Sequence, residues 1–213
     1  MIMLGVGAAC LGLFLAFWFW HSPTKRKLTQ PEIDRYLGTI ERQVFLPEDD
    51  KPKVLARLRA WAEADDGKPF YMLNLMRYYP EFRRFPGTPS FQGTPEQANE
   101  LYEKKVRQLL FKRCGYPLLA GRTQGKSLME VPPALDCWGR VLLVRYRNRR
   151  TFLSLLADPA YGPWEPYKIM AVELVLVPVS GSVVIPDLRL LVGGSLLFVF
   201  LVVGWILAFL GKS

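Results

Sequence analysis

Histidine is almost absent from this chain: among 213 residues the one histidine is His21. A His-ligated zinc site, a His-ligated haem and a Ser-His-Asp triad each require this residue. The segment that follows His21 has no histidine, so a domain there lacks the central residue of all three. The chain also lacks the GxGxxG and GxxxxGK[ST] loops that hold nucleotide phosphates. We therefore expect no catalytic residues of these types, no metal and no cofactor.

Cysteine is scarce as well, with three residues in the whole chain. Cys10 lies within an apolar segment, and Cys114 and Cys137 have no CxxC or other ligand-like spacing. In a reducing cytoplasm such residues are most simply buried thiols.

Charged residues are missing from both ends of the chain. Met1–Trp20 and Leu190–Leu210 carry none, and at about 1.5 Å per helical residue each can cross a hydrocarbon layer of about 30 Å. The first segment has no basic residues before it, unlike a signal peptide, so we expect it to be retained as an anchor. Small residues that permit close contact between membrane helices recur in it, at Gly5, Ala8, Ala9 and Gly12. The sequence thus predicts transmembrane helices at 1–20 and 190–210.

Basic residues indicate how the chain is oriented. Lys25, Arg26 and Lys27 follow the first segment directly, and the basic flank of a membrane helix tends to stay in the cytoplasm. Trp18 and Trp20 stand where aromatic residues meet the membrane surface. We expect an integral protein of the bacterial inner membrane, with the folded domain in the cytoplasm and both termini outside.

Nearly all the charge lies between the two segments: all but one of the 28 Lys and Arg, and all 19 Asp and Glu. The length suits one folded domain. Its positive charge favours membrane lipids as a partner, since anionic leaflets attract basic residues. The basic pairs and runs are short and scattered, at Arg83-Arg84, Lys104-Lys105 and 147–150, so nucleic acid is not the expected partner.

The periodicity of apolar residues predicts the elements of the domain. Two helices are expected around 33–40 and 54–62. Pro69–Tyr79 is apolar on both faces, as in a strand of a sheet covered on each side. Further elements are a helix that begins at Thr94 and ends at Gly115, strands at 118–122 and 138–146, a short helix from Asn148 to Leu156, and a last strand at 169–179.

The order of these elements, β-α-β-β-α-β, defines a ferredoxin-like α+β domain. We assign it to residues 48–179. A basic linker with an amphipathic helix precedes it at 21–47, a linker follows at 180–189, and a tail of 211–213 ends the chain.

Several motifs in order resemble the domain-of-unknown-function 1330 family of the dimeric α/β-barrel superfamily. They are MLNLMRY at 72–78, Gly121-Arg122, VLLVRY at 141–146, FLSLLADPAY at 152–161 and EPYK at 165–168. The resemblance implies a protomer that pairs sheet to sheet with a second copy, closing a barrel with a cavity in each half. Pro166-Tyr167 and Gly139 replace the proline-histidine pair and the acidic residue that relatives often have, which puts any proton transfer at those positions in doubt.

Polar residues within apolar strands, and one tyrosine, are the candidate ligand-binding residues: Asn74, Arg77, Tyr102, Arg122 and Arg145. Asn74 shares a strand face with Phe70, Met72 and Met76. In the alternative interpretation, which we favour, the asparagine satisfies a backbone group, the arginines reach solvent or a carboxylate, and the tyrosine only packs.

Two functions agree with the sequence. The first is a membrane-anchored, non-catalytic accessory or assembly subunit of a larger membrane protein complex, and the absence of a catalytic constellation favours it. The second is a membrane-tethered, cofactor-independent oxygenase or isomerase acting on a lipophilic small molecule such as a quinone or pigment, which an apolar cavity would suit. The expected partners are membrane lipids, other subunits of the complex and a second copy bound through the sheet.

Overall fold

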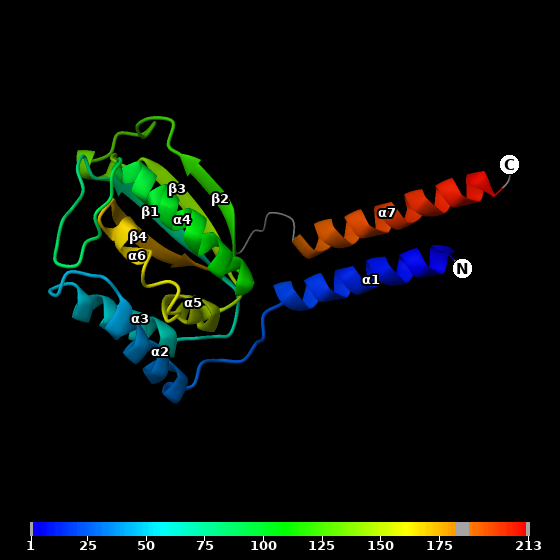
Figure 1. Ribbon diagram of the computed structural model, residues 1–213, viewed down its shortest axis with the longest axis horizontal. Helices are drawn as coiled ribbons and strands as arrows, with labels where there is room; N and C mark the ends of the chain where they lie inside the picture. Colours follow the sequence, from blue (N-terminus) through cyan, green and yellow to red (C-terminus); the bar gives the residue numbers. More distant parts are fainter. Residues whose placement is uncertain (1, 182–187, 212–213) are drawn as a thin grey trace. The chain divides into compact units, whose positions relative to one another are not determined.

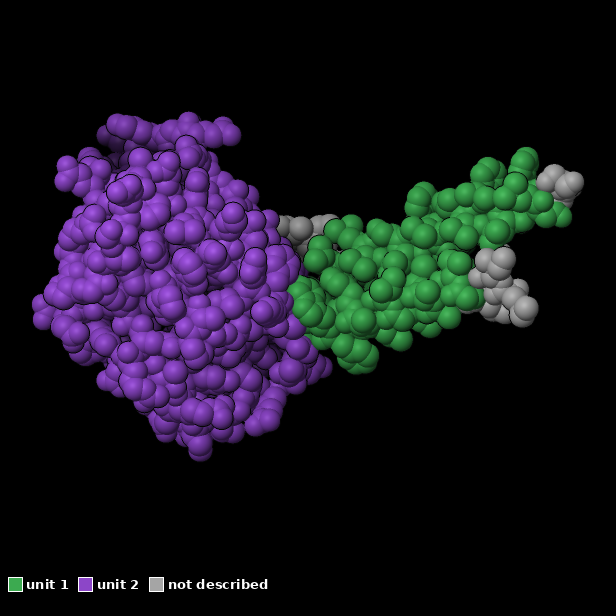
Figure 2. Space-filling view, in the orientation of Figure 1, with its two compact units in different colours: residues 1–22, 181–213 green, residues 23–180 purple. Residues whose placement is uncertain are grey.

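The computed structural model describes residues 2–181 and 188–211 and divides them between two compact units (Figures 1 and 2). Unit 1 contains the ends of the chain, up to Ser22 and from Gly181. Unit 2 is Pro23–Ser180. Residues 23–47, predicted as a separate segment, therefore lie in the same unit as the ferredoxin-like elements. Most of the predicted linker at 180–189, most of the tail at 211–213 and Met1 lie outside the described residues.

Unit 1 is an antiparallel pair of helices, α1 (Ile2–His21) and α7 (Leu188–Leu210). Glycine faces phenylalanine twice across the pair. A Cβ on Gly7 would lie 3.0 Å from the ring of Phe200, and one on Gly193 would lie 2.9 Å from the ring of Phe14. The two missing side chains therefore make room for the two rings, and this fixes the register of the helices.

One helix among the described residues, Leu188–Leu210, is long and apolar enough to cross a membrane, with a mean hydropathy of 2.6. The described side chains of α1 form the shorter apolar stretch Gly5–His21. One of the two predicted spans is therefore supported by length and composition. The small residues predicted to make a helix contact lie off the α1–α7 interface, since both Gly5 and Gly12 have open space around them.

Unit 2 is a four-stranded antiparallel sheet with helices on one face (Figure 1). Its strands are β1 (Phe70–Tyr78), β2 (Tyr116–Arg122), β3 (Arg140–Tyr146) and β4 (Val172–Val179). Its helices are α2 (Gln30–Gln43), α3 (Lys51–Glu63), α4 (Pro95–Lys112), α5 (Arg149–Leu156) and α6 (Glu165–Ile169), with a short 3-10 helix at Pro133–Leu135. The spatial order β2-β3-β1-β4 confirms the predicted β-α-β-β-α-β arrangement.

Strand pairing separates the residues of the sheet into two faces. Phe70, Met72, Asn74 and Met76 alternate as buried residues of β1 and point to the helices. They pair with Tyr146, Val144, Leu142 and Arg140 of β3. The rings of Phe70 and Tyr146 stack 5.2 Å apart in the core, against Phe152 of α5 and Trp61 of α3.

The opposite face of the sheet has no helix of unit 2 over it, among the residues that the structure describes. We call it the open face; it comprises Tyr71, Leu73, Leu75, Arg77, Tyr116, Leu119, Val141, Leu143, Arg145, Glu173, Val175, Val177 and Val179. Val175, Val177, Val179 and Leu119 are each 37–54% exposed. The sequence correctly predicts apolar residues on this face, but the predicted cover on each side of the sheet is found on one side only within the described part of unit 2.

Local signals explain where the helices begin and end. Thr94 accepts a hydrogen bond from Gln97 N and Gln97 Oε1 accepts one from Thr94 N, which confirms the predicted capping box of α4. The end of α4 differs from the prediction, since the helix ends at Lys112 and not at Gly115; Cys114 then adopts the left-handed backbone, at φ 58°. The predicted last strand at 169–179 begins only at Val172, because residues 165–169 form the short helix α6.

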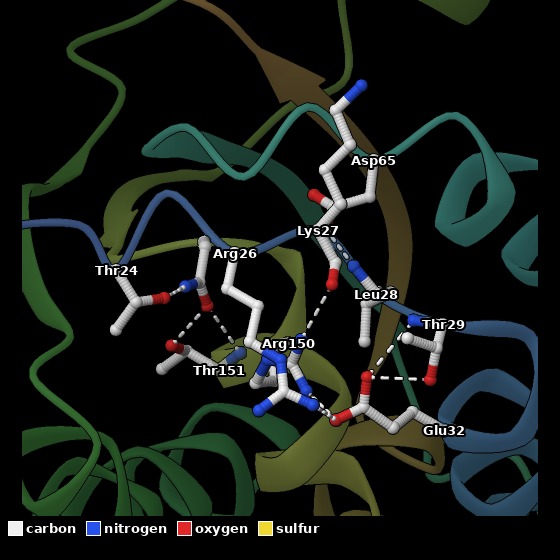
Figure 3. A network of polar contacts seen from close by, with 10 residues as sticks. Thr24, Arg26, Lys27, Leu28, Thr29, Glu32, Asp65, Arg150 and Thr151 are labelled. Atoms are coloured by element: carbon white, nitrogen blue, oxygen red, sulfur yellow. Dashed lines mark hydrogen bonds and ion pairs between the residues drawn. The ribbon is translucent and has the colours of Figure 1, made fainter.

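The basic segment before α2 is bound to the rest of unit 2 by a polar network (Figure 3). Arg150 of α5 pairs with Glu32 and donates to the carbonyl of Lys27 at 2.9 Å, and Arg26 lies 3.3 Å from Glu32. The backbone of Leu28 donates to buried Asp65 at 2.8 Å. Three of the five residues predicted at the membrane interface are basic: Lys25, Arg26 and Lys27. Arg26 and Lys27 make contacts within the domain, and the side chains of all three are exposed.

The remaining two interface residues lie in α1. Trp18 is 39% exposed, and the guanidinium of Arg189 lies 4.7 Å from the centre of its ring. Trp20 is half-buried beside Phe17. An arginine over an indole is a stabilising pair at an apolar-to-polar boundary. The position of Trp18 at a membrane surface stays a prediction.

Candidate functional site

A cavity of about 80 Å³ lies between α4 and the helix-covered face of the sheet. One wall is helical, with Tyr102, Glu103, Val106, Arg107 and Leu110. The sheet contributes Asn74, Pro117, Ala120, Leu142, Val144 and Tyr146, and α6 contributes Lys168. Most of this lining is apolar, so the polar groups that reach the cavity decide what it can hold.

Lys168 is the principal polar group of the cavity. Its side chain is 6% exposed, its Nζ donates to Asn74 Oδ1 at 3.1 Å, and Nζ lies 5.1 Å from the centre of the Tyr102 ring. Burial lowers the pKa of Lys168 to about 8, although the charges of Glu103 and Glu165 act in the opposite direction. The amine therefore stays mostly protonated at neutral pH.

Asn74 is held by three hydrogen bonds. Its Nδ2 donates to the carbonyls of Met72 at 3.1 Å and Leu142 at 3.2 Å, while its Oδ1 accepts from Lys168. The amide thus bridges β1 and β3 and presents its oxygen to the ammonium group. Both donors of the amide are used within the protein, so its structural role is evident from the geometry.

The two carboxylates nearest to the cavity have other partners. Glu103 accepts from Arg140 Nε at 2.9 Å and Nη2 at 2.6 Å, and also from Asn99 at 2.9 Å. Glu165 is 6% exposed and accepts from the backbone N–H of Phe45 at 2.9 Å. Burial raises the pKa of Glu165 to about 7, against the effects of that hydrogen bond and of Lys168.

Tyrosine hydroxyls complete the interior. Tyr102 and Tyr161 lie 3.2 Å apart through their oxygens. Burial raises the pKa of both phenols above the ordinary value of about 10. Both groups therefore stay protonated at neutral pH and serve as hydrogen-bonding groups; neither is tuned for the proton transfer expected of a general acid.

Two of the five predicted ligand-binding residues, Asn74 and Tyr102, line the cavity. The structure places the other three elsewhere. Arg77 pairs with Glu173 on the open face, and Arg145 is buried on the same face with its guanidinium 5.6 Å from the Tyr116 ring centre. Arg122 is exposed and pairs with Glu96 at 2.8 Å. Ligand binding by any of the five stays a prediction.

Sequence reasoning missed Lys168 and Glu165. Both belong to the EPYK motif at 165–168, where the sequence predicts no helix and therefore no shared face for the two side chains. The signal available was the pairing of Glu and Lys three residues apart among aromatic residues, in a stretch otherwise devoid of charge from 159 to 172. Helical spacing would have placed both on one side of a helix.

The fold and the cavity define a ferredoxin-like α+β domain joined to apolar helices. No family model matches the chain, and no curated protein matches it. The fold is shared with two solved structures of one protein of unknown function, RPA0582. The first, of methylated RPA0582, is 23% identical with a TM-score of 0.51 and covers 68% of this chain and 96% of its own. The second, from Rhodopseudomonas palustris, is 22% identical with the same TM-score and covers 67% and 98%.

A third structure is SnoaB, a cofactor-independent oxygenase from Streptomyces nogalater. It is 10% identical, has a TM-score of 0.38 and covers 56% of this chain and 99% of its own. A similarity this low carries no argument about the present chain. The RPA0582 structures show the fold alone. No family model supports the resemblance to the domain-of-unknown-function 1330 family, and membership of the dimeric α/β-barrel superfamily stays a prediction.

Proposed function

We propose that this chain is a membrane-anchored, non-catalytic accessory or assembly subunit of a larger membrane protein complex, and that its domain pairs with a second copy through the open face. Apolar side chains on an uncovered sheet support the pairing most directly. Four strands spaced about 4.8 Å apart and seven residues long cover roughly 450 Å², and exposed apolar patches of about 300–600 Å² are often functional.

The charges on the open face favour a second copy as its occupant. Arg77 and Glu173 neutralise each other, so no unpaired carboxylate would be buried. Arg145, the third charged residue of this face, is already buried beside Tyr116. A two-fold arrangement would place two apolar sheets about 10 Å apart, as in other sheet-on-sheet packings. Together two such faces bury on the order of 900 Å² when the sheets are treated as flat, just under the roughly 1,000 Å² that a specific interface should exceed. Side chains that project from the sheets add to this area.

We further propose that both apolar helices are membrane anchors, in a bacterial inner membrane, with the domain in the cytoplasm and both termini outside. The composition of α7 supports its role. The exposed side chains of Lys25, Arg26 and Lys27 support the orientation, since they are available to anionic lipid headgroups.

Oligomeric mass in mild detergent tests the pairing. We expect the full-length chain to contain two copies by light scattering, and Leu73→Glu on β1 to dissociate them, because a buried carboxylate without a partner opposes association. Leu128→Glu is the matched control, since Leu128 is fully exposed in the loop after β2. A Leu73→Glu protein with the wild-type mass, or a wild-type chain that is a monomer with no protein bound, would refute the proposal.

A second candidate function is a membrane-tethered, cofactor-independent oxygenase or isomerase acting on a lipophilic small molecule such as a quinone or pigment. The observation in its favour is the meeting of Lys168, Asn74 and Tyr102 at one cavity. The volume of this cavity, about 80 Å³, is far below the roughly 300–1,000 Å³ of pockets that enclose drug-sized molecules. The accessory role is therefore the better supported of the two.

A further inference from the structure

Lys168 is a buried cation whose hydrogen-bond partner, Asn74, and aromatic neighbour, Tyr102, are both uncharged. The ammonium has three N–H donors, and the acceptor found for it is one neutral oxygen, that of Asn74. No carboxylate oxygen in the described part of the chain lies within ion-pair distance of its Nζ. A buried charge is costly unless it is paired and fully hydrogen-bonded. The unused donors therefore call for an anionic or polar acceptor inside the cavity.

The charged neighbours of the ammonium do not supply that acceptor. Both oxygens of Glu103 are engaged by Arg140, and Glu165 accepts a hydrogen bond from Phe45 N. A second cation, Arg107, also lines the cavity, and its side chain is exposed. The cavity thus has one cation inside, one at its solvent-exposed side, and a single carboxylate that is already neutralised.

The remaining walls are apolar. Val106 and Leu110 of α4 face Leu142 and Val144 of β3 across the cavity, with the rings of Tyr102 and Tyr146 beside them. An inorganic anion would gain nothing from these walls, whereas hydrocarbon would gain roughly 25 cal/mol for each Å² it buries. The volume of about 80 Å³ limits the hydrocarbon part to a few carbons.

We propose that this cavity binds a small organic carboxylate, with its oxygen on Lys168 Nζ and a short hydrocarbon chain against α4 and β3. The site does not depend on the assembly role proposed above: a subunit without catalytic activity can hold such a ligand as a signal or as a structural component. Because Lys168 bridges α6 to β1 through Asn74, occupancy would stabilise the contact between α6 and the sheet.

Equilibrium dialysis of the full-length protein in mild detergent with radiolabelled butyrate tests the site. We expect saturable binding of one butyrate per chain, and none of butyramide, the neutral analogue. Lys168→Met should weaken butyrate binding at least about ten-fold, since a charge-assisted hydrogen bond contributes a factor of this size or more. Lys104→Met is the matched control, because this exposed lysine of α4 does not line the cavity.

A second variant guards against misfolding of Lys168→Met. Ala120 lies at the exposed edge strand β2 and lines the cavity, so Ala120→Phe should fill the space while leaving the ammonium in place. We expect it also to abolish binding. Equal binding of butyramide and butyrate, wild-type affinity in a folded Lys168→Met or Ala120→Phe protein, or no saturable binding at about 10 mM butyrate, would each overturn the proposal.

Discussion

Glu165 should make the stability of the domain depend on pH in the neutral range. Its carboxyl group is buried, and its pKa is raised from 4.5 to about 7. A carboxyl whose pKa is higher in the folded state favours folding when it is protonated. That contribution is complete below pH 4.5, where the group is protonated in both states, and it is lost as the pH rises through 7.

The size of the effect follows from proton linkage. Between pH 5 and pH 7.5 a shift from 4.5 to about 7 lowers the free energy of unfolding by about 2–3 kcal/mol. For a domain of this length, that corresponds to a decrease in melting temperature of roughly 5–10 °C. Glu165→Gln removes the ionisation while keeping an acceptor for Phe45 N, so the variant should lack this decrease.

Thermal unfolding of the full-length protein in detergent, followed by near-ultraviolet circular dichroism at several pH values, measures the difference. Glu41→Gln serves as the control, because Glu41 is an exposed residue of α2. Groups that do not interact with Glu165 contribute equally to all three proteins and cancel in the comparison. Lys168, whose pKa the Glu165 charge raises, does not cancel, so the comparison is made below pH 7.5, where this lysine stays mostly protonated. Parallel pH profiles for wild type and Glu165→Gln would refute the argument that burial of this carboxyl opposes its ionisation.

Two further predictions concern the cavity and the membrane. Asn74→Ala should lower the free energy of unfolding by about 1–3 kcal/mol, because it leaves the carbonyls of Met72 and Leu142 and the ammonium of Lys168 without their amide partner. Denaturant titration measures this loss, with Gln108→Ala at an exposed position as the control. Equal stability of the two variants would contradict the prediction. Gly211→Cys, made after replacement of the three native cysteines, should react with a membrane-impermeant thiol reagent in intact cells. Labelling only after lysis would place the C-terminal end in the cytoplasm and contradict the prediction.

The sequence predicts the fold well where local signals and burial agree. The capping box at Thr94 and the side-chain cap at Asn148 mark helix starts that the structure confirms. Alternation along β1 correctly places Asn74 with the buried apolar residues. These features depend on residues close together in the chain, so their physical basis is visible without the tertiary structure.

The candidate site was harder to predict because it depends on contacts between distant segments. Arg145 and Asn74 both interrupt apolar strands, yet strand pairing puts them on opposite faces of the sheet. Lys168 reaches Asn74 across 94 positions of sequence, through a helix too short to be recognised from periodicity. Strand pairing and the path of the chain decide which polar residues meet, and both depend on contacts between segments that are far apart in the sequence.

The glycine–phenylalanine pairs of α1 and α7 have a thermodynamic consequence for the domain between them. If these pairs hold the two helices together when the domain unfolds, the roughly 160 residues from Pro23 to Ser180 unfold as a closed loop instead of a chain with free ends. Closing a loop of that length reduces the entropy of the unfolded chain by an amount worth about 5 kcal/mol, as a disulfide at the same positions would. In a chain whose cysteines are all free, the helix pair would then act as a non-covalent cross-link.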